Sequence, residues 1–442
     1  MKKNLTVAIA VITLFAALAI PARLAAQEQQ EHNKKLPRYK VIDLGTLGGT
    51  FSEALGINSK GWVTGLSTLP GDASVHALLW RKGVKTDLGT LGGPNSTPNG
   101  FMTSASVSQR GEIVGAAESS AADPLGENFF LCNFNDGLGL LCLPFLWHDG
   151  AMRPLPTLGG NNGAAFQINN RGQAVGGAEN TTHDPTCVAP QLLQFKPVIW
   201  EEGEIQELPT ISGDLDGVAF AINDRGQAVG VSTDCTLTPG HALLWQDGKV
   251  TDMGTLRGLA LVPSDINNEG QVVGVALVPN GQNVEAFLWH RGFVRGLGTL
   301  PGDAWSAGNA INDKGQVIGQ SAPPNSLQRG FIWQNGVMTD LNTLIPADSN
   351  LYLFDPQDIN SRGEIAGQAI EKNTGAFVAF LAIPCDEEAD KEGCKDQANG
   401  ATAAGQKIDD GPRFTLPENV RRLLQQRLSY PYRFTGSGMG RD

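Results

Sequence analysis

The sequence has few of the residues from which catalytic and metal sites are recognised. It contains only six histidines and six cysteines in 442 residues, with no Cys-x-x-Cys pair and no His-Glu-x-x-His helix of the kind that holds zinc. It also lacks a Gly-x-Ser-x-Gly elbow, a phosphate-binding P-loop and a dinucleotide-binding glycine fingerprint. These absences point away from the common enzyme classes. We expect no catalytic residue, no metal and no cofactor.

Basic residues are in the minority. The 33 Lys and Arg are outnumbered by 45 Asp and Glu, which gives a formal net charge of -12. Because binding to phosphates needs a basic surface, nucleic acid is excluded as a partner, and an anionic membrane surface is disfavoured for the same reason. The 55 glycines and 25 prolines indicate short strands joined by tight turns.

One long apolar run is present, and it lies near the N-terminus. Two lysines precede an apolar segment from 5 to 20, and small residues up to Ala26 lead into a polar stretch. This order predicts a signal peptide over 1–26, followed by a short linker over 27–37. An uncleaved membrane anchor is the alternative. Since no second long apolar run follows, we expect an exported chain, periplasmic or extracellular, with no membrane span after signal removal.

An even number of cysteines in an exported chain indicates disulfide bonds. Six cysteines allow 15 pairings, so the choice rests on proximity along the chain. It favours the pairs Cys132 with Cys142, Cys187 with Cys235, and Cys385 with Cys394.

A ten-residue phrase recurs seven times. AINDRGQAVG at 221–230 is matched by GINSKGWVTG, QINNRGQAVG, DINNEGQVVG, AINDKGQVIG, DINSRGEIAG and a more divergent SVSQRGEIVG. Successive turn glycines are 44 to 61 residues apart, at Gly61, Gly111, Gly172, Gly226, Gly270, Gly315 and Gly363. Catalytic motifs normally occur once in a chain, so a phrase repeated at this spacing predicts an array of structural units.

Each unit predicts four antiparallel strands. In the unit at 216–256, an apolar strand leads into the turn NDRG, where Gly226 tolerates a positive φ. QAVGVS then returns as its partner, HALLW forms a third strand, and the more polar VTDMGTL forms the fourth. The last unit ends at GAFVAFLAIP without a fourth strand, whereas a matching segment, RYKVIDLGTL, precedes the first unit.

This offset predicts a closed ring, because it lets the N-terminal strand complete the last unit and removes open sheet edges. The sequence therefore predicts an all-β fold over 38–384. The fold is a seven-bladed β-propeller of four-stranded antiparallel blades, with the N-terminal strand as the outer strand of the last blade.

The unit LGTLGG…AxxINxxGxVVG…HAFLW resembles the HAF repeat of bacterial extracellular proteins, and the resemblance covers roughly 38–384. The chain departs from it in two ways. The histidine of the His-Ala-Phe triplet is present only at His76 and His241, and Val107-Ser108 stands where Ile-Asn is expected. The resemblance implies the repeat architecture and an exported location, and it implies no reaction.

Three residues are candidate ligand-binding residues. Asp214 and Asp303 share a repeat-equivalent position in a loop expected at one end of the ring, and Trp305 lies in such a loop, where it could stack on a sugar. The competing interpretations are a turn-forming Asp and a Trp with no ligand. A glycosidase would need two carboxyl groups about 5–10 Å apart.

Loop length gives the clearest functional indication. The second-to-third loops carry insertions at 116–143 and 177–196, and both are expected at the same end of the ring. We expect a monomeric, non-catalytic binding or scaffold module that recognises extracellular polysaccharide or protein there. The alternative is a glycoside hydrolase or polysaccharide lyase with carboxylates at the mouth of the central channel. A structural envelope protein without a specific ligand is the third hypothesis.

The C-terminal segment 385–442 carries no repeat. Its polar, small-residue composition predicts disorder, apart from a short amphipathic helix over 416–428, where Val420, Leu423 and Leu428 follow helical spacing.

Overall fold

The computed structural model describes residues 36–385, except for 99–106, 128, 130, 133, 135–136, 188, 212, 236–239, 278–283 and 325. The chain divides into Met1–Arg38, of which only the last three residues are described, and the unit that starts at Tyr39. The predicted signal peptide, most of the linker, and the tail with its helix at 416–428 lie outside the described residues.

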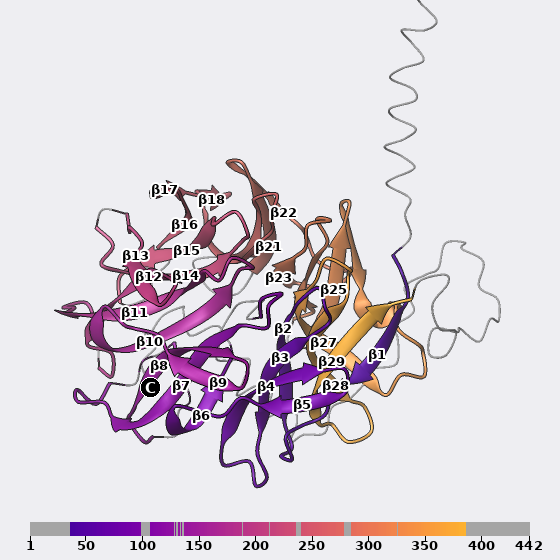
Figure 1. The fold of residues 1–442 in the computed structure, drawn as a ribbon. Coiled ribbons are helices and arrows are strands. Elements are labelled where there is room, and N and C mark those ends of the chain that lie inside the picture. The colour runs from indigo at the N-terminus through magenta and orange to yellow at the C-terminus, as the bar shows by residue number, and fades with distance from the viewer. Residues whose placement is uncertain are drawn as a thin grey trace, which may run out of the picture. The chain divides into compact units, whose positions relative to one another are not determined.

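From Tyr39 onward the chain forms seven antiparallel sheets arranged as the blades of a propeller (Figure 1). This confirms the predicted fold class. Blades are numbered along the chain, and their strands are given from the inner to the outer one. Blade 1 contains β2 (Ser52–Ile57), β3 (Val63–Thr68), β4 (Val75–Arg81) and β5 (Val84–Asp87); blade 2 contains β6 (Gly92–Thr97), β7 (Ile113–Ala122), β8 (Leu140–His148) and β9 (Ala151–Pro154); blade 3 contains β10 (Gly159–Ile168), β11 (Ala174–His183), β12 (Leu193–Glu201) and β13 (Glu204–Glu207).

The remaining blades repeat this order with one addition. Blade 5 has a fifth strand of two residues, β18, which pairs with its inner strand. Blade 4 contains β14 (Asp216–Ile222), β15 (Ala228–Thr233), β16 (His241–Gln246) and β17 (Lys249–Asp252); blade 5 contains β18 (Thr255–Leu256), β19 (Leu259–Ile266), β20 (Gln271–Leu277), β21 (Val284–His290) and β22 (Phe293–Gly296); blade 6 contains β23 (Trp305–Ile311), β24 (Val317–Ala322), β25 (Arg329–Gln334) and β26 (Val337–Asp340), followed by the 3-10 helix η1 (Leu341–Thr343); blade 7 contains β27 (Leu351–Ile359), β28 (Ile365–Glu371) and β29 (Phe377–Pro384).

The N-terminal strand closes the ring. Strand β1 (Tyr39–Asp43) pairs antiparallel with β29, from Tyr39 opposite Pro384 to Asp43 opposite Phe380. Blade 7 thereby obtains its outer strand from the start of the chain, as the offset in the repeat predicts. In Figure 1 the indigo β1 lies beside the yellow-orange β29.

The last glycine of each repeated phrase is required by close contact between strands. A Cβ on Gly230 would collide with the carbonyl oxygen of Val218 on the inner strand. The inner strand has a register shift between Ala219 and Ala221, immediately after this contact, which is typical of a β-bulge. The equivalent glycines of the other six blades meet an inner-strand carbonyl in the same way.

The asparagine of each phrase joins neighbouring blades. Asn223 accepts hydrogen bonds from the N–H groups of Arg225 and Gln227 in its own turn, both at 3.0 Å, and its Nδ2 donates to the Asn267 carbonyl of blade 5 at 2.9 Å. We call the resulting chain of bonds the asparagine belt. Its other links run from Asn58 to Ser108, Asn169 to Asn223, Asn267 to Asn312, Asn312 to Asn360 and Asn360 to Asn58.

The belt has one substitution, at Ser108 of blade 2. Its hydroxyl accepts from the turn N–H groups of Arg110 and Glu112, both at 3.2 Å, but serine has no amide to reach the next blade. The Gln109 N–H donates to Asn170 Oδ1 at 2.8 Å. Asn170, Asp224 and Asn268 donate to the next blade in the same way, so blade 2 keeps this second link to blade 3. The repeated phrase is therefore the device that closes each inner hairpin and ties successive blades together.

Candidate functional site

Asp214 is held within its own blade. It lies just before β14, and its Oδ2 accepts a hydrogen bond from Ser232 Oγ at 2.5 Å and lies 2.9 Å from His241 Nδ1. Only 18% of the Asp214 side chain is exposed. The contact ties the start of the inner strand to the start of the third strand.

Asp303 makes the same kind of contact in blade 6. Its fully buried carboxylate receives Arg329 Nη2 at 2.6 Å, and Arg329 Nη1 lies 3.3 Å from Asp340. Blade 5 reverses the charges, with Arg257 2.8 Å from Glu285. In blades 4, 5 and 6 a polar or charged residue at the start of the third strand is thus paired with a charged residue that precedes the inner strand of the same blade. Asp214 and Asp303 are not brought together, since blade 5 separates them.

Trp305 is not a loop residue. It is the first residue of β23, paired with Ala322 of β24, and it is partly buried. The pairing of β23 with β24 extends to Trp305, since the next residue, Ser306, lies opposite Ser321. The hydroxyl of Ser321 also donates a hydrogen bond to the Trp305 carbonyl at 3.1 Å. The expected position in a loop is therefore wrong.

The two insertions form one end of the ring around blades 2 to 4. Disulfides Cys132–Cys142 and Cys187–Cys235 confirm two of the predicted pairings. The second joins the insertion of blade 3 to the corresponding loop of blade 4. Cys385 is also disulfide-bonded, but Cys394 lies outside the described residues, so the third pairing stays a prediction.

The insertions contact each other directly. Glu127 in the first insertion is 2% exposed, and its Oε1 accepts hydrogen bonds from the N–H groups of Leu192 and Leu193 in the second, at 2.7 and 2.8 Å. Phe129 of the first insertion stacks edge-on against Phe195 with ring centroids 6.4 Å apart. The two loops therefore form a single wall.

Buried carboxylates concentrate beneath this wall. Glu179 is fully buried, and it accepts hydrogen bonds from Gln191 Nε2 at 2.7 Å and from the Asn162 N–H at 2.9 Å. Asn162 Nδ2 also donates to Asp123 at 2.8 Å. Burial raises the pKa of Glu179 to about 7, and the nearby charge of Glu127 adds to this effect. Sequence reasoning missed this network because acidic residues in a long polar loop give no indication of burial.

A cavity of about 210 Å³ opens beside the network. Its wall includes two carboxylates, Glu118 and Glu127, the rings of Phe129 and Phe134, and the Cys132–Cys142 disulfide. Glu118 Oε2 accepts a hydrogen bond from Asn95 Nδ2 at 2.8 Å. An apolar wall with a few fixed polar groups is the usual composition of a small-ligand site.

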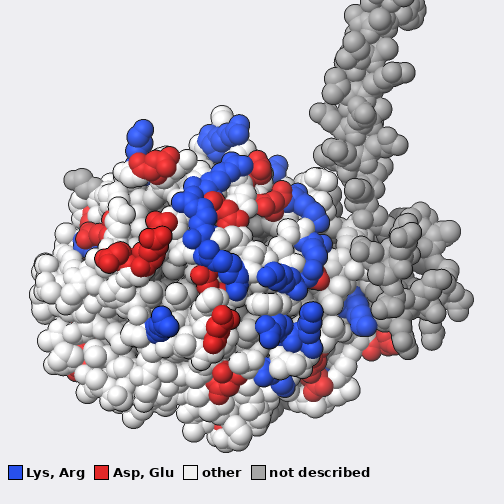
Figure 2. All heavy atoms as spheres, in the orientation of Figure 1, with Lys and Arg blue, Asp and Glu red and all other residues white. Residues whose placement is uncertain are grey.

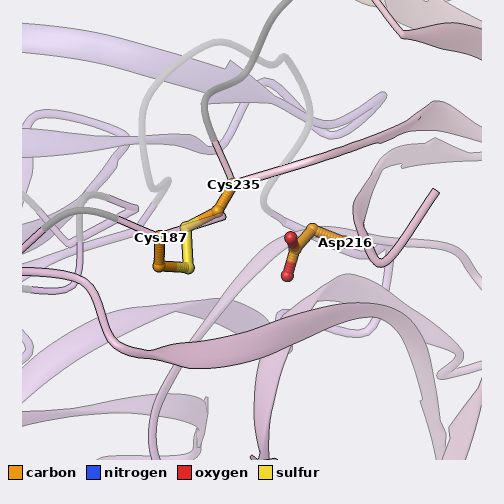
Figure 3. A group of neighbouring side chains, drawn as sticks. All are labelled: Cys187, Asp216 and Cys235. Carbon is orange, nitrogen blue, oxygen red and sulfur yellow. A yellow bond between two sulfur atoms is a disulfide. The ribbon is translucent and has the colours of Figure 1, made fainter. Parts of the chain in front are cut away.

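A pair of buried carboxylates, Asp184 and Asp216, lies near the Cys187–Cys235 disulfide. Figure 3 shows Asp216 beside Cys187 and Cys235, with potential ligand atoms of all three within 4.8 Å of one another. The two sulfurs are bonded to each other, so they are not available as thiolate ligands. Asp216 and Asp184 are both fully buried. Burial raises the pKa of Asp216 to about 7, and the charge of Asp184 adds to the rise.

Two further carboxylates lie on neighbouring inner strands, Asp355 on β27 and Glu53 on β2. Asp355 accepts hydrogen bonds from Gln320 Nε2 and from Asn309 Nδ2, the latter at 3.2 Å. Loss of hydration raises the pKa of Asp355 to about 7, and the charge of Glu53 contributes. The residues at the same register in blades 3, 4 and 5 are apolar, namely Ala164, Val218 and Val262, so the pair is not part of the repeat.

Comparisons with known proteins extend to the fold alone. No protein-family model matches the chain, and no curated protein matches it. Among solved structures, the β-propeller domain of the trilobed protease from Pyrococcus furiosus is 11% identical, with a TM-score of 0.40 over 65% of this chain and 81% of that one. The acylaminoacyl peptidase of Pyrococcus horikoshii is 11% identical, with a TM-score of 0.44 over 77% of this chain and 53% of that one, so the chain spans about half its length. YCF48 bound to D1 peptide is 12% identical, with a TM-score of 0.45 over 80% of this chain and all of that one.

The described part of the chain contains no helix long and apolar enough to cross a membrane.

Proposed function

We propose that the protein is an exported, non-catalytic binding module of the HAF-repeat type, which recognises an extracellular polysaccharide through the wall formed by its two insertions. The cavity beside Phe129 and Phe134 carries the proposal. Phe129 is buried and Phe134 is partly buried, so the Phe134 ring is the one that offers an apolar face to a sugar. The carboxylates of Glu118 and Glu127 line the cavity and offer hydrogen-bond acceptors to hydroxyl groups.

Rigidity of the wall supports binding over a purely structural role. The Cys132–Cys142 and Cys187–Cys235 disulfides fix both insertions, and the Glu127 carboxylate bonds one to the other. A loop that is ordered before binding loses less conformational entropy when a ligand arrives. The disulfides also suit an oxidising compartment outside the cytoplasm.

The test is binding of the exported chain to a panel of polysaccharides, with free reducing ends measured in the same samples. We expect saturable binding without new reducing ends. Phe134→Ala should weaken it by about tenfold, since a stacked ring contributes on the order of 1–2 kcal/mol. Phe293→Ala removes an 82% exposed ring from a hairpin of blade 5 far from the insertions in the fold and is the matched control.

A specific observation supports a second function, that of a glycoside hydrolase. Asp355, with a pKa raised to about 7, has the property of a general acid, and Glu53 would be its carboxylate partner. New reducing ends that disappear in Asp355→Asn, but persist in Phe134→Ala, would favour the hydrolase and contradict the binding module. Binding to no polysaccharide would contradict both.

A further inference from the structure

The end of the propeller opposite the insertions is built from hairpin turns. In blades 1 to 6 the first and third turns lie at the same end, because the strands alternate in direction. Blade 7 has only a first turn there, since its outer strand is β1. We call this the turn end. It comprises the inner turns at 58–62, 108–112, 169–173, 223–227, 267–271, 312–316 and 360–364, and the outer turns at 81–84, 148–151, 201–204, 246–249, 290–293 and 334–337.

Charge is segregated on the turn end. The turns of blades 5, 6, 7 and 1 contain six basic residues, Lys60, Arg81, Lys82, Arg291, Lys314 and Arg362, but only three acidic ones, Glu269, Asp313 and Glu364. Lys85 and Arg295 follow two of these turns and extend the group, which we call the basic half. The turns of blades 2 to 4 have the opposite excess, with Glu201, Glu202 and Glu204 in one hairpin. In Figure 2 Lys and Arg gather over the middle of the ring and over the blade of β2–β5.

The acidic residues of the basic half are mostly engaged. Glu364 lies 2.5 Å from Arg362, and Glu269 pairs across the blade boundary with Arg225 at 3.4 Å. Two cations instead lie over aromatic rings. Arg81 is 4.9 Å from the ring centre of Trp62, and Arg295 is 4.7 Å from that of Trp333, contacts that position a cation without neutralising it.

Exposed apolar side chains accompany these cations. Val84, Phe293 and Val337 are 64%, 82% and 62% exposed, and each is the last residue of an outer turn of the basic half, at the same repeat position. A Cβ on Gly83 or Gly292 at these turns would meet no atom within 4 Å, so the hairpin tips project into open space.

We infer that the basic half is a docking surface for an anionic lipid bilayer. Lysine and arginine are attracted to acidic headgroups, and apolar side chains beside them enter the headgroup region. The exposed Phe293, Val84 and Val337 favour a bilayer over a soluble acidic polymer, because a hydrophilic polymer offers no apolar environment for them. This role goes beyond the proposed function, which uses the opposite end.

The net charge of the whole chain does not oppose this docking. At physiological ionic strength charges are screened over about 8 Å, so a bilayer responds to the nearest residues. Many of the carboxylates lie elsewhere, in the hairpin at 201–204 or buried under the insertions, as Glu127 and Glu179 are. The expectation from composition that an anionic membrane surface is disfavoured applies to an even distribution of charge, which this chain does not have.

The first measurement is cosedimentation of the exported chain with vesicles. We expect binding to vesicles of phosphatidylcholine with 30% phosphatidylglycerol (roughly the acidic content that gives a substantial surface potential), weakened by added salt, and little binding to phosphatidylcholine alone. Absence of binding to the acidic vesicles at low salt would overturn the inference.

The variants use residues that the protein already tolerates at the same turn position. Lys82→Asp with Arg291→Asp places in blades 1 and 5 the residue found natively as Asp149 and Asp247 in blades 2 and 4. Each basic residue near an acidic bilayer increases binding about fivefold, so the double variant should bind at least about 25-fold more weakly. The matched control, Lys249→Asp in blade 4, should change binding less than about twofold.

The apolar contribution is tested separately. Phe293→Ala introduces the residue that Ala151 provides in blade 2 and should weaken binding about tenfold. Circular dichroism spectra and melting curves that match the wild type establish that each variant is folded. Equal binding by the wild type and the double variant would overturn the inference. So would binding to soluble polygalacturonate together with no binding to acidic vesicles, a result that would assign the basic half to an anionic polysaccharide.

Discussion

Replacing an asparagine of the belt tests whether the repeated phrase holds the blades together. Asn312 is 4% exposed. Its Oδ1 accepts from the N–H groups of Lys314 and Gln316, both at 3.1 Å, and its Nδ2 donates to the Asn360 carbonyl of blade 7 at 3.0 Å. Asn312→Ala leaves three backbone groups without these partners. At about 1 kcal/mol each, the free energy of unfolding should fall by about 3 kcal/mol.

Asn312→Ser separates the two functions of the side chain. Ser108 shows that a serine hydroxyl accepts both N–H groups of its own turn and donates to Glu112 Oε2 at 2.9 Å, where the Asn312 amide donates to Gln316 Oε1 at 2.8 Å. The serine variant should therefore keep the contacts within its turn and lose the bond to blade 7, or about 1 kcal/mol. The reverse change, Ser108→Asn, supplies an amide where the belt lacks one, and should be neutral or stabilising by up to about 1 kcal/mol.

Urea unfolding followed by tryptophan fluorescence, with the disulfides intact, measures these differences. The expected order of stability is wild type, then Asn312→Ser, then Asn312→Ala. If serine and alanine variants are equally stable, or if both lie within about 0.5 kcal/mol of the wild type, the belt does not join the blades in the way described.

Three other perturbations follow from the buried charges and the disulfides. Because the pKa of Asp355 is raised to about 7, the folded chain holds a proton that the unfolded chain has lost, so the free energy of unfolding should fall between about pH 4 and pH 7. Asp355→Asn should make this part of a urea-midpoint against pH profile less steep, while Glu179 and Asp216, whose pKa values are also raised to about 7, maintain the rest of the slope. Arg329→Met leaves the fully buried Asp303 unpaired and should cost about 3–5 kcal/mol, a loss that adding Asp303→Asn should partly restore; an additive double variant would contradict the pairing. Cys187→Ser with Cys235→Ser opens a loop of 48 residues and should cost about 4 kcal/mol by denaturant unfolding, whereas an unchanged midpoint would mean that the bridge does not constrain the unfolded chain.

The candidate site was less predictable than the fold. Asp214 and Asp303 stood out because they share a repeat position in a loop, yet each is bonded to a partner at the start of the third strand of its own blade. An aspartate that forms an ion pair and one that binds a ligand look alike in a sequence. The partners His241 and Arg329 are 27 and 26 residues further along the chain, and only the blade topology brings them close.

The insertions show the same limit. Their lengths and cysteines identified the end of the ring that carries them, and proximity identified the pairs Cys132–Cys142 and Cys187–Cys235. The burial of Glu127 and Glu179 was not predicted, because it depends on how one insertion packs against the other. Likewise the net charge of -12 gave no indication that one half of the turn end carries an excess of basic residues.

The sequence by itself determined the architecture, because the same local pattern is written seven times. Each copy requires the same turn and the same close glycine, and six of the seven form the same asparagine bond. Counting strands was then enough to predict the closure by β1, as the pairing of Tyr39 with Pro384 confirms. The chemistry of the surface was decided only by the tertiary structure. Residues such as Glu53 and Asp355, or Lys82 and Arg291, are far apart in the chain and become neighbours, or members of one surface, only when the ring closes.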